Sequence, residues 1–150
     1  MSVDQAVTQD LIKTLENGYV GFQRAAEKLS SSNEPQLSAE FIKFGEQRSQ
    51  FAAELGLLAA GYGDQVEQRS TLPGALHRGW MAVKDMLAGS DGDGVLEAAA
   101  QGEDHAVEEY EAALQEDISA GLRTVITRQY VQVQAARDFV IVARDGAKHT

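Results

Sequence analysis

Apolar residues recur at steps of three and four along almost the whole chain, and this spacing limits the possible folds more than any other feature. Residues that repeat in this way lie on one face of an α-helix. The stripe of the first segment consists of Leu11, Leu15, Gly18, Phe22, Ala25 and Leu29. Similar stripes predict long helices over residues 3–30, 35–60, 95–117 and 120–144. No segment alternates apolar and polar residues over the length of a strand, so the pattern predicts an all-α protein.

The lengths of the breaks between these helices predict their arrangement. The chain turns near Asn33 and again near Ser119 within a few residues, so the helices on either side of each turn must be antiparallel. The connection over residues 62–94 is much longer, and a short apolar stripe after Pro73 predicts an extra helix near residues 73–88. Such a connection can return along the bundle and leave the second and third long helices parallel. Two antiparallel hairpins joined by one long crossover form the ferritin-like type of four-helix bundle.

Length, charge and cysteine content limit the classes of function. The chain has 150 residues, no cysteine and a formal net charge of −10, and this length predicts one bundle domain over residues 1–150. The lack of cysteine excludes disulfides, thiolate metal sites and cysteine nucleophiles. The negative charge argues against nucleic acid or an anionic membrane as a ligand. We expect neither a secretory signal nor a bilayer-spanning segment, and therefore a cytoplasmic protein.

Four polar residues occupy positions within the apolar stripes. They are Arg48, Glu103, Gln129 and Arg137. In ferritin-like di-metal proteins two helices each supply a glutamate, and the other two each supply a glutamate three residues before a histidine. At the corresponding positions of this chain Glu103 is the one carboxylate retained, and the two arginines occupy the places of the histidines. Arginine stays charged and cannot ligate a metal.

These residue types predict an internal Arg–Glu–Arg network of Arg48, Glu103 and Arg137 in place of a di-metal site. The two guanidinium groups would offset the cost of burying the carboxylate through charge-assisted hydrogen bonds. No other catalytic set is present in the sequence, so we expect a non-enzymatic protein without a cofactor that acts by self-association or by binding a protein partner. A two-fold dimer is the commonest oligomer, and His77 and Trp80 of the predicted crossover helix are the candidate contact.

The sequence leaves two other functions open. One is a metal-binding protein that holds iron or another divalent ion, and its candidate ligands are Glu16, Glu46, Glu54, Glu103 and His105. The other is an enzyme that uses Arg48 and Glu103 as an anion-binding or acid–base site. The neighbouring carboxylates Glu108 and Glu109 are predicted to belong to a solvated acidic face.

Four short stretches of the sequence resemble a known family. Residues 22–27 read F-Q-R-A-A-E, residues 48–55 read R-S-Q-F-A-A-E-L, residues 74–80 read G-A-L-H-R-G-W and residues 102–114 read G-E-D-H-A-V-E-E-Y-E-A-A-L. Together they resemble a bacterial four-helix-bundle family of unknown function within the ferritin-like superfamily. The resemblance implies a ferritin-like bundle, discussed as a metal binder or stress-associated protein, and implies no established reaction. Members often resemble A-A-H-D where this chain has A-A-R-D at residues 135–138, so Arg137 replaces an imidazole.

Overall fold

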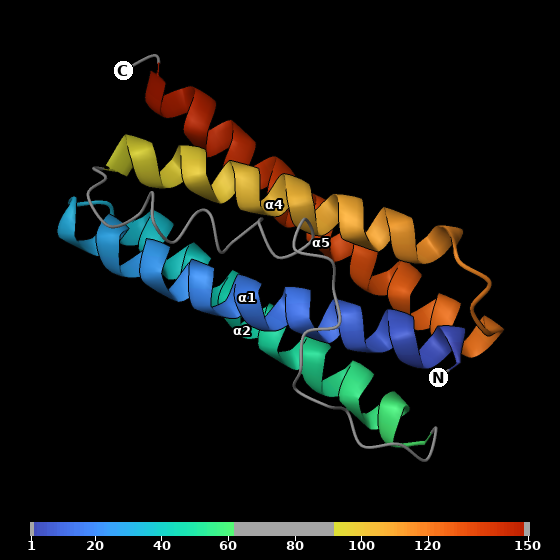
Figure 1. Cartoon of the computed structure of the whole chain (residues 1–150). Helices are drawn as coiled ribbons and strands as arrows, with labels where there is room; N and C mark the ends of the chain where they lie inside the picture. Colours follow the sequence, from blue (N-terminus) through green and yellow to red (C-terminus); the bar gives the residue numbers. More distant parts are fainter. Residues whose placement is uncertain (1, 62–91, 149–150) are drawn as a thin grey trace.

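The computed structural model describes residues 2–61 and 92–148, which form four long helices (Figure 1). Their bounds are Val3–Ser31 for α1, Pro35–Ala60 for α2, Gly92–Gln115 for α4 and Ala120–Lys148 for α5. The described residues contain no strand, so the predicted all-α class is confirmed, and each predicted long helix lies within a few residues of its expected bounds. The predicted extra helix near residues 73–88, with His77 and Trp80, lies outside the described residues.

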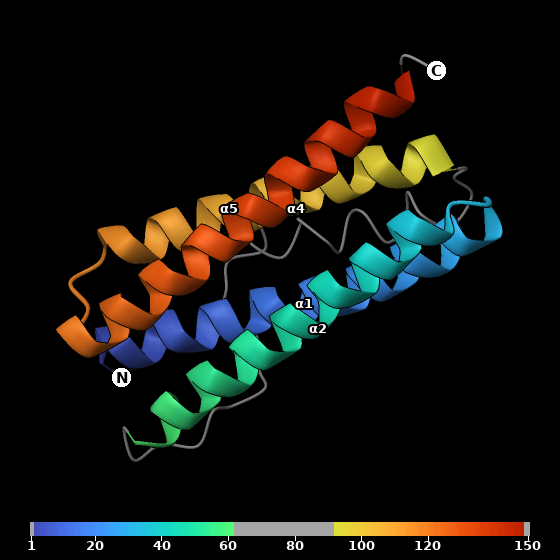
Figure 2. The same ribbon diagram turned by 180° about the vertical axis from the view of Figure 1, so that it is seen from behind.

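The helices form two antiparallel hairpins, α1 with α2 and α4 with α5 (Figures 1 and 2). Helices α2 and α4 run in the same direction, an arrangement that the length of the connection between them allows. Helix α1 packs against both α2 and α4, whereas the backbones of α2 and α5 approach each other at only a few positions. The start of α1 is tied to the α4–α5 turn, because the backbone N–H of Ser119 donates to Oδ1 of Asp4 at 2.9 Å.

The helix ends carry the residues that stop or start a helix. At the start of α1 the Ser2 hydroxyl accepts from the backbone N–H of Gln5 at 3.1 Å, and the Gln5 side chain accepts from the backbone N–H of Ser2 at 2.8 Å. This reciprocal arrangement satisfies two backbone donors that a helix leaves unpaired. In the α1–α2 turn Asn33 has a φ of 63°, which asparagine tolerates better than most residues. Pro35 then occupies the first turn of α2, where its missing N–H costs nothing.

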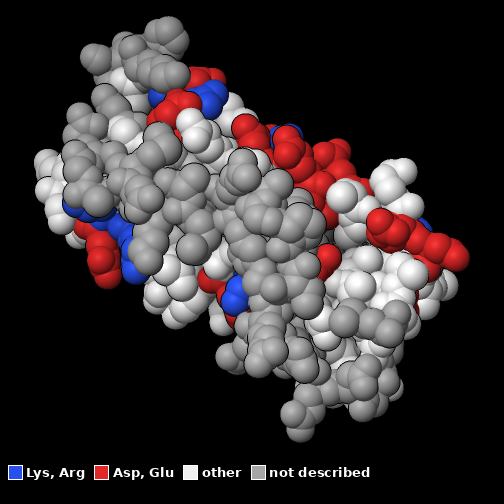
Figure 3. All heavy atoms as spheres, in the orientation of Figure 1, with Lys and Arg blue, Asp and Glu red and all other residues white. Residues whose placement is uncertain are grey.

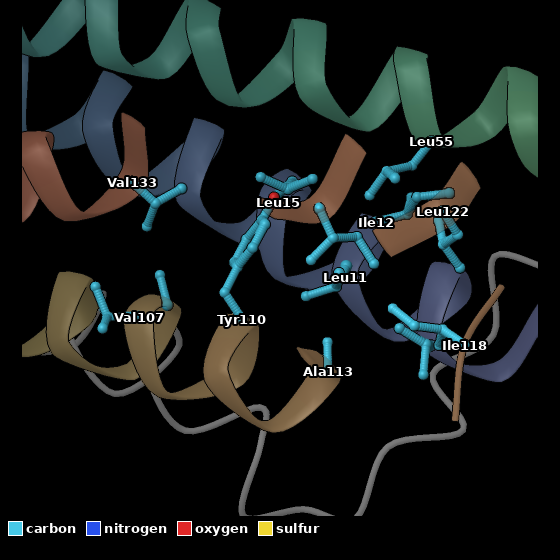
Figure 4. Close-up of a cluster of buried hydrophobic side chains, with 13 residues drawn as sticks. Leu11, Ile12, Leu15, Leu55, Val107, Tyr110, Ala113, Ile118, Leu122 and Val133 are labelled. Atoms are coloured by element: carbon cyan, nitrogen blue, oxygen red, sulfur yellow. The ribbon is translucent and has the colours of Figure 1, made fainter. Parts of the chain in front are cut away.

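Two clusters of buried apolar side chains fill the bundle. One lies toward the α1–α2 turn, and in it the rings of Phe22 and Phe41 meet edge to face with centroids 5.4 Å apart. The other lies toward the α4–α5 turn and includes Leu15, Leu55 and Tyr110 (Figure 4). Along α2 and α4 the buried Arg48 and Glu103 lie between these clusters, so the two apolar regions enclose a polar pair near the middle of the bundle.

Gly45 allows α1 and α2 to approach closely. It is buried, and a Cβ at this position would lie 3.3 Å from the Cβ of Phe22. We therefore expect Gly45→Val to lower the free energy of unfolding by about 1–3 kcal/mol through overpacking. The matched control is Gly56→Ala in the same helix, where a Cβ meets nothing within 4 Å and should stabilise by up to about 1 kcal/mol. Urea unfolding followed by circular dichroism measures both, and an unchanged midpoint for Gly45→Val would contradict the close approach.

Candidate functional site

The centre of the bundle contains a buried ion pair between Arg48 of α2 and Glu103 of α4. Nη1 of Arg48 donates to Oε2 of Glu103 at 2.8 Å, and Nη2 donates to Oε1 at 2.6 Å. The side chains are 1% and 0% exposed, respectively. Because α2 belongs to one hairpin and α4 to the other, this two-point contact joins the hairpins through the interior. Paired, charge-assisted hydrogen bonds of this geometry are among the strongest in proteins.

Other groups complete the surroundings of the guanidinium. Its Cζ lies 5.3 Å from the centroid of the Phe22 ring, where the face of the ring attracts a cation. Nε of Arg48 donates to Oε1 of Gln47 at 3.4 Å. The charge of Arg48 is therefore compensated on three sides by a carboxylate, an aromatic face and an amide oxygen.

Arg137 does not take part in this pair, so the prediction of an Arg–Glu–Arg network is wrong in its third member. Its Nε and Nη2 donate to Oδ1 of the neighbouring Asp138 at 3.3 and 3.2 Å, and its side chain is 28% exposed. On α5 the buried positions after Val133 are Ala136 and Val140. A helical repeat of 3.6 residues lets either residue 136 or residue 137 follow Val133 on the inner face, and the smaller alanine takes that place.

Gln129 forms a second polar centre that links three helices. It is fully buried, its Oε1 accepts from the hydroxyl of Tyr110 at 2.8 Å, and its Nε2 donates to Oε1 of Glu54 at 2.8 Å. Arg128 donates to the other oxygen of Glu54. Burial acts to raise the pKa of Glu54, but the hydrogen bonds from Gln129 and Arg128 and the charge of Arg128 lower it overall. Burial raises the pKa of Tyr110 well above its ordinary value, so its hydroxyl remains a donor.

The structure does not bring the candidate metal ligands together. Glu16 and Glu46 are exposed, Glu54 and Glu103 are bonded as described above, and Nδ1 of His105 lies 3.9 Å from Oε2 of Glu108. Within residues 2–61 and 92–148 no three histidine, aspartate or glutamate side chains are grouped so that they could hold a metal ion. The permanent charge of Arg48 beside Glu103 also repels a cation from the one buried carboxylate of the stripes.

Glu109 is a half-buried group that the sequence interpretation missed. Figure 3 shows acidic side chains along α4, and Glu108 is indeed exposed. Glu109 instead borders a hollow of about 150 Å³ between α1 and α4, and its buried Oε2 has no hydrogen-bond partner among the described residues. Burial, followed by the charges of Asp10 and Glu108, raises the pKa of Glu109 to about 8. Its position three residues after Ala106 and four before Ala113, which are both buried, was the available clue.

Comparison with known families adds one match. Residues 6–116 match the domain of unknown function DUF2383. The chain belongs to this family. The DUF2383 match includes the Arg48–Glu103 pair and ends just after α4, so Gln129 and Arg137 of α5 lie beyond it.

Two further findings accompany the DUF2383 match. No curated protein matches the chain. None of the helices in the described part of the chain is both long and apolar enough to cross a membrane. A domain of unknown function brings no reaction with it, so the function has to be inferred from the site itself.

Proposed function

We propose that this DUF2383 protein is a ferritin-like bundle without a metal centre, and that it acts by self-association as a dimer. The observation that carries the proposal is the buried pair of Arg48 and Glu103. It occupies the interior between the two hairpins, where ferritin-like di-metal proteins place their ligands. Both oxygens of Glu103 already accept hydrogen bonds from Arg48, and a metal ion would have to displace a guanidinium that never loses its charge.

Burial of the pair also argues against catalysis at this place. A substrate would have to reach Arg48 and Glu103, whose side chains are 1% and 0% exposed. At the second polar centre Gln129 is fully buried and is bonded to both Tyr110 and Glu54, so its amide is already engaged. The polar groups of these two centres are therefore engaged with each other, which favours the surface as the part of the molecule that binds a partner.

The test combines metal content with molecular mass. Protein purified without a chelator should contain no stoichiometric metal by mass spectrometry, and its melting temperature should not rise when Fe²⁺, Mn²⁺ or Zn²⁺ is added, since a bound ion would stabilise the fold. Light scattering at micromolar concentration should give the mass of two chains. A stoichiometric metal that disappears in Glu103→Gln would overturn the metal-free centre. A monomer at every concentration and ionic strength would overturn self-association.

A further inference from the structure

Helix α1 carries a row of charges on the side that faces away from the buried Phe22. The row consists of four charged residues with a valine at their centre: Lys13, Glu16, Val20, Arg24 and Glu27. They follow one another at steps of three, four, four and three residues, and such steps place side chains on one face of a helix. Glu16, Arg24 and Glu27 are exposed, Lys13 is half-buried and Val20 is 43% exposed. No ion pair within the described part of the chain uses any of these four charges.

This row of α1 has opposite charges at equal distances from Val20. Glu16 and Arg24 each lie four residues from it, and Lys13 and Glu27 each lie seven residues from it. If two α1 helices packed antiparallel with Val20 beside its counterpart, Glu16 would face Arg24 of the other copy, and Lys13 would face Glu27. A two-fold axis repeats each of these pairs, because residue i then meets residue j and residue j meets residue i. In this arrangement no residue of the row would face a residue of like charge in the other copy.

We propose that two copies of the chain associate through this charge row of α1, antiparallel and with the two-fold axis at Val20. The proposal rests on the proposed self-association and names its surface. Apolar area lies beside the row, since Ile42 of α2 is 48% exposed and borders a shallow hollow of about 630 Å³ with Tyr19 and Gln23. Exposed Val20 and Ile42 would provide an apolar centre and the charges a polar rim, which is the usual composition of an interface.

The alternation of charge favours a second copy over other partners. A uniformly acidic partner would be repelled by Glu16 and Glu27, and a uniformly basic one by Lys13 and Arg24. A second α1 helix supplies the complementary order without any further assumption, because the same sequence is present in both copies. Such pairs are screened by salt, so we expect the dimer to weaken as ionic strength rises.

Charge reversal tests the surface. Arg24→Glu would place the introduced carboxylate opposite Glu16 of the second copy, twice in each dimer, and should raise the dissociation constant about tenfold or more at low ionic strength. Glu16→Arg should do the same. The double variant Glu16→Arg with Arg24→Glu should restore the dimer. Residues 16 and 24 lie about 12 Å apart along one helix, so the restored pairing can come only from a second copy.

A matched control and a cross-link complete the experiment. Glu108→Arg makes the same chemical change as Glu16→Arg, but at an exposed position of α4. It should leave the dissociation constant, measured by sedimentation equilibrium, unchanged. The chain has no cysteine, so Val20→Cys should form a disulfide between copies on mild oxidation, whereas Val131→Cys, on α5 and 56% exposed, should not. A dimer that tolerates both reversals and does not cross-link through Val20→Cys would overturn this surface while leaving self-association intact. A wild-type protein that is always monomeric would overturn self-association itself.

Discussion

Replacement of Arg48 by methionine should lower the free energy of unfolding by about 3–5 kcal/mol, because it leaves a buried carboxylate without its partner. Glu103 is fully buried and receives two hydrogen bonds from the guanidinium that would be lost. Methionine fills a similar volume, so the loss should come from the stranded charge and not from a cavity. Urea unfolding followed by circular dichroism, with the slope checked for a constant two-state transition, measures the difference.

A double variant distinguishes the effect of losing the whole ion pair from the effect of losing one of its two residues. Arg48→Met combined with Glu103→Leu should unfold with a free energy close to that of the wild type, since no charge is then buried unpaired. The coupling energy of this cycle isolates the contact between the two residues. The matched control is Arg137→Met, which should change stability by no more than about 0.5 kcal/mol, because the one partner of Arg137 among the described residues is its exposed neighbour Asp138. A double variant less stable than either single variant would contradict the role assigned to the pair.

The helices could be predicted because the sequence pattern that indicates each of them lies within the helix itself. Apolar stripes such as Leu11 to Leu29 repeat with the period of a helix over many turns, and the short breaks at Asn33 and Ser119 leave only antiparallel neighbours. The inward positions of Arg48, Glu103 and Gln129 follow from the same periodicity, and all three are buried in the structure.

Contacts between helices could not be predicted in the same way. Periodicity fixes an inward direction only to within about one residue, so it could not distinguish Arg137 from Ala136 as the residue that follows Val133 inside the bundle. It also gives no distance between helices, so the link from Tyr110 through Gln129 to Glu54 was not foreseen. Glu109 was misjudged because an acidic neighbourhood in sequence suggests exposure, whereas its place beside α1 is set by packing.

Glu109 should make the protein less stable as the pH rises. Burial and the nearby charges of Asp10 and Glu108 raise its pKa from 4.5 to about 8 in the folded protein, whereas the unfolded chain has the ordinary value. Between these two pH values the folded state holds a proton that the unfolded state has released, so the free energy of unfolding falls with increasing pH. One pKa unit corresponds to about 1.4 kcal/mol. The total loss should be on the order of a few kcal/mol, reduced by the partial exposure of the side chain.

Glu109→Gln should abolish this fall, because an amide does not ionise in the window. The variant should match the wild type near pH 5, where Glu109 is protonated in the folded protein, and should be more stable by a few kcal/mol near pH 9. Glu108→Gln is the control: it removes an exposed carboxylate beside Glu109 and should retain the fall, with its upper end shifted slightly to lower pH. Urea unfolding at about pH 5, 7 and 9 measures all three proteins. Parallel curves for the wild type and Glu109→Gln would show that Glu109 ionises freely and that its hollow between α1 and α4 is open to water.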